Sequence, residues 1–336
     1  MLLATEALLR LLPVSTATLT GYHHDPLVLT YPTHHTWQVS TGWDLRNPQR
    51  MTSNNWGFAA GRDFTANPQA VALIGDSYVE ASMLAAPDRP GAQLETLLGG
   101  RPVYSMAMPG TSLLDYAQRI RLAQQNFGIR DVVLLVERYD ARQAICGADS
   151  GAGRCLDLAT MQVRNERPPP ASALKRVARQ SALAQYLGSQ LKVRPGQLVQ
   201  ALFTRTPPQH APRPGSPGFV PTIPNASQIA QAQASVDAVV DAFFADARPF
   251  LKGRLVIVVD GRRTGPAEVL ELVDFERTRL IERLRAGGAV VHDLELLYGA
   301  YRARSPRSLD VGPYDEHLNP MGVHIAMGAA AESLRP

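Results

Sequence analysis

The chain has 336 residues, 45% hydrophobic and 19% charged, so it is long enough to bury one large core or two modest ones. Its 34 basic and 30 acidic residues give a formal net charge of +4, but the arginines are spread along the chain. Because only 7% of residues are aromatic and they do not alternate with basic ones, no nucleic-acid partner is expected. The chain has neither a Walker-type phosphate loop nor a Gly-x-Gly-x-x-Gly fingerprint, and no cofactor is expected.

The chain starts with a short apolar stretch. Residues 1–12 contain Glu6 and Arg10 and end before Pro13. A bilayer span needs about 20 apolar residues, and a secretory signal needs a basic start, so this stretch fits neither. Residues 1–40 are predicted to be an N-terminal segment. Its first helix is interpreted as the stub of a membrane anchor or as an amphipathic helix packed on the domain.

Several ring-bearing residues precede the first strong apolar run. The residues considered for a metal site or a pocket are two histidine pairs and two aromatic residues: His23, His24, His34, His35, Trp56 and Phe58. A metal site would need the histidines to meet a carboxylate, and none has ligand spacing on a helix, so exposed loop positions are favoured. The two aromatic residues are interpreted as core or pocket wall.

A serine follows that apolar run. Residues 71–74 are predicted to be a buried strand, and a helix is predicted to begin after Ser77. A serine at such a turn lies at the carboxyl edge of a sheet, where open α/β sheets bind ligands. Free backbone N–H groups at the turn are suited to hold an oxyanion. Gly-Asp-Ser is a common tripeptide, so its meaning depends on a base elsewhere in the chain.

Short apolar runs and helical patterns alternate along much of the chain. The predicted strands are 71–74, 103–106, 132–136, 255–259 and 290–292, and the predicted helices include 112–127 and 267–285. Continuous apolar strands are typical of sheets covered on both faces. The alternation therefore predicts an α/β fold with a parallel sheet.

A long stretch separates the third and fourth predicted strands. Residues 142–251 are predicted to be an insertion with a loop at 142–170, helix-compatible residues at 172–203, a Pro-rich extended part at 204–224 and a helix at 226–251. Insertions of this size are often lids or binding walls. A cap that sets acceptor specificity and a decoration unrelated to catalysis both remain open.

Both cysteines, Cys146 and Cys155, lie in this insertion. Their spacing suits a disulfide that closes a small Gly-rich loop, which would imply an oxidising compartment. Two free thiols are the alternative. No second cysteine pair or histidine cluster accompanies them, so a zinc site is disfavoured and no metal is expected.

A late segment supplies a base and an acid. Asp315 and His317 lie two residues apart on a predicted loop, because an Asn-Pro pair follows and begins a terminal helix. A loop that holds both side chains is able to aim the imidazole and fix its tautomer, as a serine nucleophile requires. Glu316 is the alternative acid, and His324 in the terminal helix is the fallback base.

The early Gly-Asp-Ser and the late Asp-x-His-Leu-Asn-Pro-x-Gly resemble the SGNH (GDSL-type) hydrolase superfamily. Residues 75–81 and the Asp-x-His spacing are more narrowly similar to bacterial members related to alginate-type polysaccharide O-acetyltransferases. The resemblance implies a flavodoxin-like three-layer α/β/α fold, with residues 41–141 and 252–336 as the catalytic domain. It also implies Ser77 as nucleophile, His317 as base and Asp315 as the acid that orients the base.

The resemblance also implies an oxyanion hole. The N–H groups of Ser77 and Gly110 are its expected donors. The family's third block usually supplies an Asn, which this chain lacks after residues 132–136. Arg138 stands near that place and is interpreted either as a donor to the oxyanion or to a substrate carboxylate, or as the partner of Glu137 in a structural ion pair.

The expected function is a serine esterase or O-acyltransferase acting on acyl, in particular acetyl, esters. A cell-envelope or extracellular polysaccharide is the expected acceptor. The competing class is a non-catalytic carbohydrate-binding or polysaccharide-assembly protein that retains the fold. The periplasm, or a membrane facing it, is the expected location, with the cytoplasm as the alternative.

Overall fold

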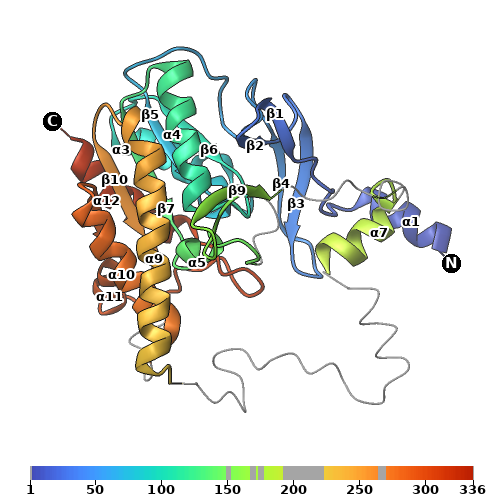
Figure 1. Ribbon diagram of the computed structural model, residues 1–336. Helices are drawn as coiled ribbons and strands as arrows, with labels where there is room; N and C mark the ends of the chain where they lie inside the picture. Colours follow the sequence, from blue (N-terminus) through green and yellow to red (C-terminus); the bar gives the residue numbers. More distant parts are fainter. Residues whose placement is uncertain are drawn as a thin grey trace.

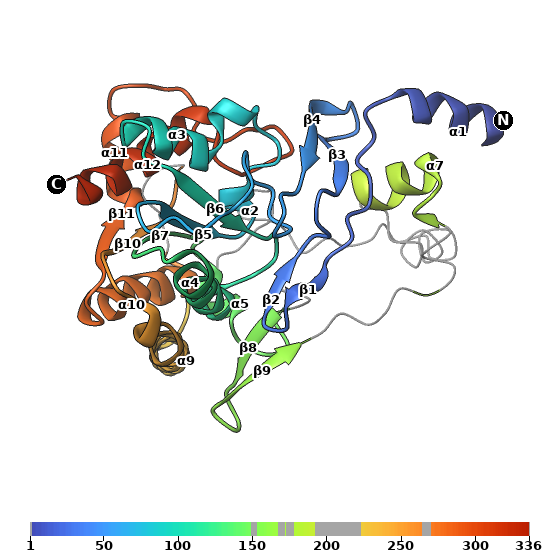
Figure 2. The same ribbon diagram turned by 90° about the horizontal axis from the view of Figure 1, so that it is seen from above.

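The five predicted strands pair into one parallel sheet. In a computed structural model that describes residues 2–148, 153–166, 172, 178–191, 223–263 and 270–335, they are β5 (Val71–Gly75), β6 (Val103–Ala107), β7 (Asp131–Val136), β10 (Leu255–Val259) and β11 (Val290–Asp293). Their order across the sheet is β11-β10-β7-β5-β6 (Figures 1 and 2). Read from the other edge, this is the flavodoxin-like order 2-1-3-4-5. The predicted strands and their parallel arrangement are confirmed.

Helices cover both faces of this sheet and make three layers (Figure 2). One face carries α4 (Leu113–Phe127), α9 (Ala226–Ala247) and α10 (Leu272–Ala286). The other carries α3 (Pro90–Leu97), α11 (Leu294–Arg302) and α12 (Pro320–Leu334). The expected three-layer α/β/α class is therefore the observed one.

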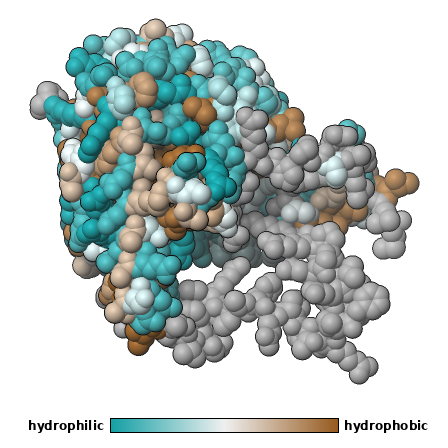
Figure 3. All heavy atoms as spheres, in the orientation of Figure 1, coloured by the Kyte–Doolittle hydropathy of each residue, from teal (hydrophilic) through white to brown (hydrophobic). Residues whose placement is uncertain are grey.

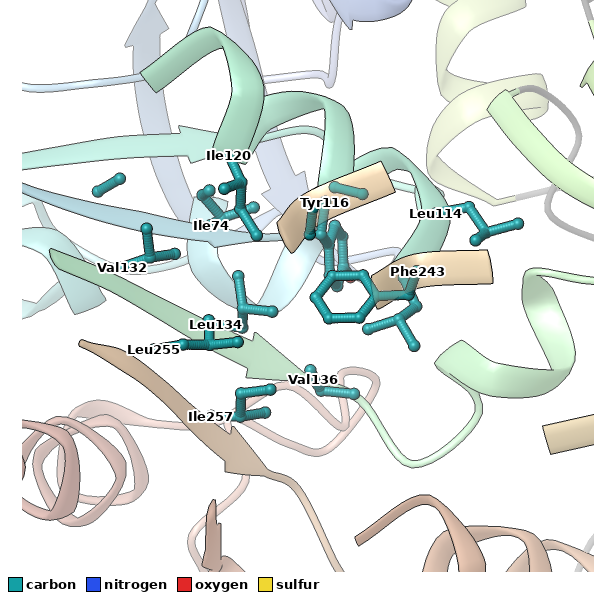
Figure 4. Packing of buried hydrophobic residues seen from close by; sticks show 14 of the residues in the cluster. Ile74, Leu114, Tyr116, Ile120, Val132, Leu134, Val136, Phe243, Leu255 and Ile257 are labelled. Atoms are coloured by element: carbon teal, nitrogen blue, oxygen red, sulfur yellow. The ribbon is translucent and has the colours of Figure 1, made fainter. Parts of the chain in front are cut away.

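The strands β5, β6, β7 and β10 each contribute to two cores, whereas the edge strand β11 adds only the partly buried Val291 to the first. Leu134 and Val136 of β7 pack in the core under α4 and α9, whereas Leu135 packs with α12 on the opposite face. Figure 4 shows the first core, in which the strand side chains lie against Tyr116 of α4 and Phe243 of α9. Burial on both faces explains why the strands are continuous apolar runs rather than alternating ones.

The helix ends follow local sequence signals. Ser112 and Asp115 form a capping box at the start of α4, and Asn319 caps α12 by accepting hydrogen bonds from the next two free N–H groups. The helix predicted over 267–285 begins at Leu272, where Glu271 and Asp274 form another capping box. Part of that prediction, residues 267–269, lies outside the described residues.

The insertion differs from its prediction in one part. Residues 142–170 were expected to be a loop, which is wrong for β8 (Gly153–Asp157) and β9 (Gln162–Glu166), an antiparallel hairpin. Cys155 and Leu156 are buried, and the Leu156 N–H donates to the Ala144 carbonyl at 2.7 Å, so tertiary contacts hold the strand in place.

The later parts of the insertion are described in pieces. Residues 178–191 contain α7 (Ala182–Gln185) and a π-helical turn at Tyr186–Gln190, as helix-compatible sequence predicts. The Pro-rich stretch up to residue 222 lies outside the described residues. The predicted final helix is α9, which packs against α4 and α10 in the sheet's own helical layer. The boundaries assigned to the insertion and to the catalytic domain stay predictions.

Cys146 and Cys155 form a disulfide. This confirms the disulfide and removes the alternative of two free thiols. In the part of the chain that the structure describes, a carboxylate of Glu166 lies near both sulfur atoms in a ligand-like group. Because the sulfurs are bonded to each other, neither is available as a thiolate ligand.

The N-terminal region forms two antiparallel hairpins beside the sheet. They are β1 (Gly21–Asp25) with β2 (Val28–Thr30), and β3 (Thr36–Thr41) with β4 (Arg46–Thr52). His23 and His24 are exposed but lie on β1, so the expectation of a loop is wrong for them. The described residues contain no group of three metal ligands that includes a histidine. Trp56 and the fully buried Phe58 pack in the main core.

The helix α1 (Leu2–Leu11) exposes apolar side chains. Leu3 is 87% and Leu11 is 84% exposed, and hydrophobic colour marks this end of the molecule (Figure 3). Among the described residues, no helix has the length and apolar character that a membrane crossing requires. Membrane association through this segment stays a prediction.

Candidate active site

The turn that carries Ser77 is held tightly. The helix α2 (Ser77–Glu80) begins two residues after β5 ends, with Asp76 as its cap accepting from the Tyr78 N–H at 2.9 Å. A Cβ on Gly75 would lie 2.8 Å from the Leu135 carbonyl oxygen, so only glycine fits. Since β5 pairs with both β6 and β7, the serine lies at the switch point of the sheet, where this fold class binds ligands.

The structure brings together Ser77, His317 and Asp315. His317 Nε2 lies 2.8 Å from Ser77 Oγ, although the two residues are 240 positions apart in the chain. His317 Nδ1 lies 2.6 Å from Asp315 Oδ1, which also accepts from the His317 backbone N–H at 2.9 Å. A proton on Nδ1 leaves Nε2 free to accept from the serine hydroxyl, which is the tautomer a base needs.

The two alternatives to this arrangement lie elsewhere. Glu316 is exposed, and its backbone carbonyl accepts from Arg263 at 2.6 Å. His324 is exposed on α12 beside a cavity of about 550 Å³ that Asp88 and Met321 also line. The hydrogen bonds of the serine therefore favour His317 as the base.

Tyr78 shields one side of the imidazole. Its ring centroid lies 4.8 Å from that of His317. Burial and the nearby Asp260 raise the pKa of Tyr78 above its usual value, so its hydroxyl keeps its proton. A half-buried histidine against an aromatic face has fewer orientations open to it, and this side chain was missed by sequence reasoning.

The two other predicted oxyanion residues differ in their surroundings. Gly110 is exposed with a φ of 73°, on a loop that starts beside the nucleophile turn, because the Met108 N–H donates to the Gly75 carbonyl at 3.3 Å. Arg138 donates from Nη2 to Asp274 at 3.2 Å. The structural ion pair expected with Glu137 is thus made with a carboxylate of α10. Both oxyanion roles stay predictions.

Arg119 underlies the site, a role that sequence reasoning missed. Although arginine is usually an exposed residue, Arg119 of α4 is only 1% exposed. Its Nη1 donates to the Gly75 carbonyl at 2.7 Å and its Nη2 to Thr111 Oγ1 at 2.9 Å. One guanidinium therefore joins the turn that carries Ser77 to the loop that carries Gly110. A single arginine in a helical pattern gave no signal of this.

Buried carboxyl groups surround the same region. Asp140 accepts from the Tyr116 hydroxyl and the Glu137 N–H, each at 2.9 Å. Burial, followed by the charges of Asp76 and Glu137, raises the pKa of Asp140 well above its usual value. Burial, with repulsion from Asp260 and Asp76, raises the pKa of Glu137 to about 8. These groups therefore favour their neutral forms at the edge of the site.

Glu137→Gln is expected to change how stability depends on pH. Between 4.5 and about 8 the unfolded chain has released the Glu137 proton and the folded chain retains it. The free energy of unfolding therefore falls with rising pH, by at most about 1.4 kcal/mol per pH unit for this one group. Glutamine cannot titrate and still accepts from the Tyr139 N–H, so the variant should have a flatter profile.

Urea unfolding at a series of pH values across that window measures the effect. Glu282→Gln, at an exposed position of α10, is the matched control and should keep the wild-type slope. A constant difference between wild type and Glu137→Gln at every pH would contradict the prediction.

The fold and the site together define an α/β protein of flavodoxin-like topology. A serine, a histidine and an aspartate form one hydrogen-bonded chain at the carboxyl edge of its sheet. No protein-family model matches the chain, and no curated protein matches it.

Solved structures resemble the chain at low identity. A member of the lipolytic protein G-D-S-L family from Veillonella parvula matches with a TM-score of 0.39 and 10% identity, over 78% of this chain and 96% of that one. The acetyl xylan esterase AlAXEase gives 0.39 and 10%, over 79% and 100%. A salicylyl-acyltransferase from a tetracycline biosynthetic pathway gives 0.37 and 12%, over 82% and 57%. A functional assignment therefore depends on the chain's own residues.

Proposed function

We propose that the protein is a serine esterase or O-acyltransferase. The observation that carries this proposal is the hydrogen-bonded order Ser77 Oγ, His317 Nε2, His317 Nδ1 and Asp315 Oδ1. A binding protein without turnover has no need of a base aimed at a serine hydroxyl. The geometry therefore favours an enzyme over the non-catalytic carbohydrate-binding or assembly protein.

The reaction proceeds in two halves. Ser77 Oγ attacks the carbonyl carbon of the ester as His317 Nε2 takes its proton, and the N–H groups of Ser77 and Gly110 stabilise the oxyanion. The intermediate collapses, His317 returns the proton to the leaving alcohol, and an acyl-enzyme remains. Water or a sugar hydroxyl then attacks the acyl carbon and gives its proton to His317, which passes it to Ser77 Oγ as the bond between that oxygen and the acyl carbon breaks. Asp315 stabilises the imidazolium in both halves.

A carbohydrate acceptor is supported by two exposed aromatic side chains, one on the loop that carries Asp315 and His317 and one in contact with it. Trp43 is 64% and Tyr314 is 54% exposed. The Trp43 Nε1–H donates to the Tyr314 hydroxyl at 3.0 Å, and Tyr314 directly precedes Asp315. Such rings are amphipathic surfaces on which the apolar face of a sugar is able to pack.

The finer assignments have less support. Acetyl as the acyl group, a polysaccharide acceptor and kinship with alginate-type O-acetyltransferases are carried by the sequence resemblance. The disulfide between Cys146 and Cys155 supports an oxidising compartment, and the periplasm or the membrane facing it is the location we propose.

Incubation with p-nitrophenyl acetate tests the proposal. Release of p-nitrophenol and a transient acetyl group on the Ser77 peptide, detected by mass spectrometry, are expected. Oligosaccharides added as acceptors separate transfer from hydrolysis, because transfer gives an acetylated sugar. Glycan binding in the absence of any acetyl adduct at Ser77 would favour the non-catalytic class instead.

A further inference from the structure

We propose that Arg263 is a positioning residue that holds the Asp315–His317 loop against the sheet, beside the turn of Ser77. This inference rests on the proposed function, because it concerns the same site. Arg263 follows β10 by four residues. Its side chain is almost buried, and it contacts neither the serine nor the imidazole ring directly in any hydrogen bond of the described residues.

The guanidinium of Arg263 has partners on three separate segments. Its Nη1 lies 2.7 Å from Asp260 Oδ2, at the end of β10. Its Nε lies 2.5 Å from Asp310 Oδ1, and its Nη2 donates to the Glu316 carbonyl at 2.6 Å. Both partners lie on the loop between α11 and α12, which also carries Asp315 and His317. The same Nη2 donates to the Tyr78 hydroxyl at 3.3 Å.

These partners flank both halves of the site. The Glu316 carbonyl lies between Asp315 and His317 in the chain, whereas Tyr78 directly follows Ser77. A rotation of the Glu316 peptide would turn the imidazole away from the serine. Holding that carbonyl therefore holds the direction of His317 Nε2.

Hydrogen bonds inside the loop give it a defined shape. The Val311 N–H donates to the His317 carbonyl at 2.9 Å and the Gly312 N–H to the Asp315 carbonyl at 2.7 Å. These bonds join parts of the loop to one another and leave its place relative to Ser77 to other contacts. Arg263 supplies such a contact, since its other partners belong to β10 and to the nucleophile turn.

Asp260, the partner of Arg263 at the end of β10, is itself held in place by several contacts. Asp260 is buried, accepts from the Tyr298 hydroxyl at 3.0 Å and has its N–H bonded to the Val136 carbonyl at 2.8 Å. Arginine suits this position because its planar fork binds several acceptors at fixed angles. Lysine keeps the charge but has a single ammonium, which cannot reproduce the fork.

Arg263→Lys is the test variant because it retains the charge between Asp260 and Asp310. The kcat for p-nitrophenyl acetate is expected to fall about 10- to 100-fold while KM stays near the wild-type value, as expected when a catalytic group is misplaced. The proton between His317 Nδ1 and Asp315 should lose or shift its low-field NMR resonance. Arg101→Lys is the control, because it alters a similar ion pair, with Asp131 at 2.7 Å, at the amino ends of the strands. This variant should change neither kcat nor the resonance.

Arg263→Ala supplies a second measurement. Added methylguanidinium should restore part of the lost kcat and methylammonium should not, which a general loss of stability would not produce. Wild-type kcat and an unchanged resonance in Arg263→Lys would overturn the proposal, as would equal rescue by both cations. If the wild type shows no turnover that depends on Ser77, the proposed function fails, and the resonance still decides whether Arg263 positions His317.

Discussion

Ser77→Ala is expected to lower kcat for p-nitrophenyl acetate by roughly 10⁴- to 10⁶-fold and to abolish the acetyl adduct. In the proposed mechanism the serine oxygen forms the bond to the acyl group, so no neighbouring side chain replaces it. Because Ser77 is at the start of α2 and its hydroxyl bonds to His317 rather than to the core, the free energy of unfolding should change little.

His317→Gln should lose activity on the same scale, since the serine and its base act as one unit. His324→Gln is the matched control at the fallback position, and Ser235→Ala on α9 is the control for the nucleophile; both should retain wild-type kcat. A loss in His324→Gln with activity retained in His317→Gln would contradict the assignment of the base, whatever the geometry of the free protein.

The parts of this fold that depend on local pattern were open to sequence reasoning. A strand buried on both faces is expected to be apolar throughout, so β5, β7 and β10 are visible as short apolar runs. A proline after Asn319 marks the start of α12, because asparagine caps the helix and proline suits its first position. The serine and the Asp-x-His loop were found for the same reason: each lies where an element begins or ends.

The parts of the fold that depend on contacts between distant residues could not be predicted from the sequence. The β8–β9 hairpin is short and polar, and it is held by the disulfide and by Leu156 in the core. Nothing in the residues near Arg119 or Arg263 distinguishes them from the other arginines of the chain. Their burial follows from how α4 and β10 pack beside the nucleophile turn, which is a property of the tertiary structure.

Arg119→Met is expected to reduce the free energy of unfolding by about 3–5 kcal/mol at neutral pH. Burial lowers the pKa of the Arg119 guanidinium, and the nearby carboxyl groups, Asp115 first, offset part of that cost. Methionine fills similar space but removes the shorter of two hydrogen bonds to the Gly75 carbonyl, and it leaves the Thr111 hydroxyl oxygen without its arginine donor. The activity of the remaining folded protein should also fall, because the two loops that carry the proposed oxyanion donors lose the guanidinium that joins them.

Urea unfolding at neutral and at acidic pH separates the charge contribution from packing. Burial already raises the pKa of Asp76, Asp115 and Asp140, so these carboxyl groups protonate readily once the cation is removed. The destabilisation should therefore be smaller at acidic pH than at neutral pH. Arg121→Met on the same helix removes an ion pair with Asp25 nearer the surface and should cost at most about 1 kcal/mol. Equal losses in the two variants would show that Arg119 is an ordinary member of α4 and that its link between the two loops contributes no stability of its own.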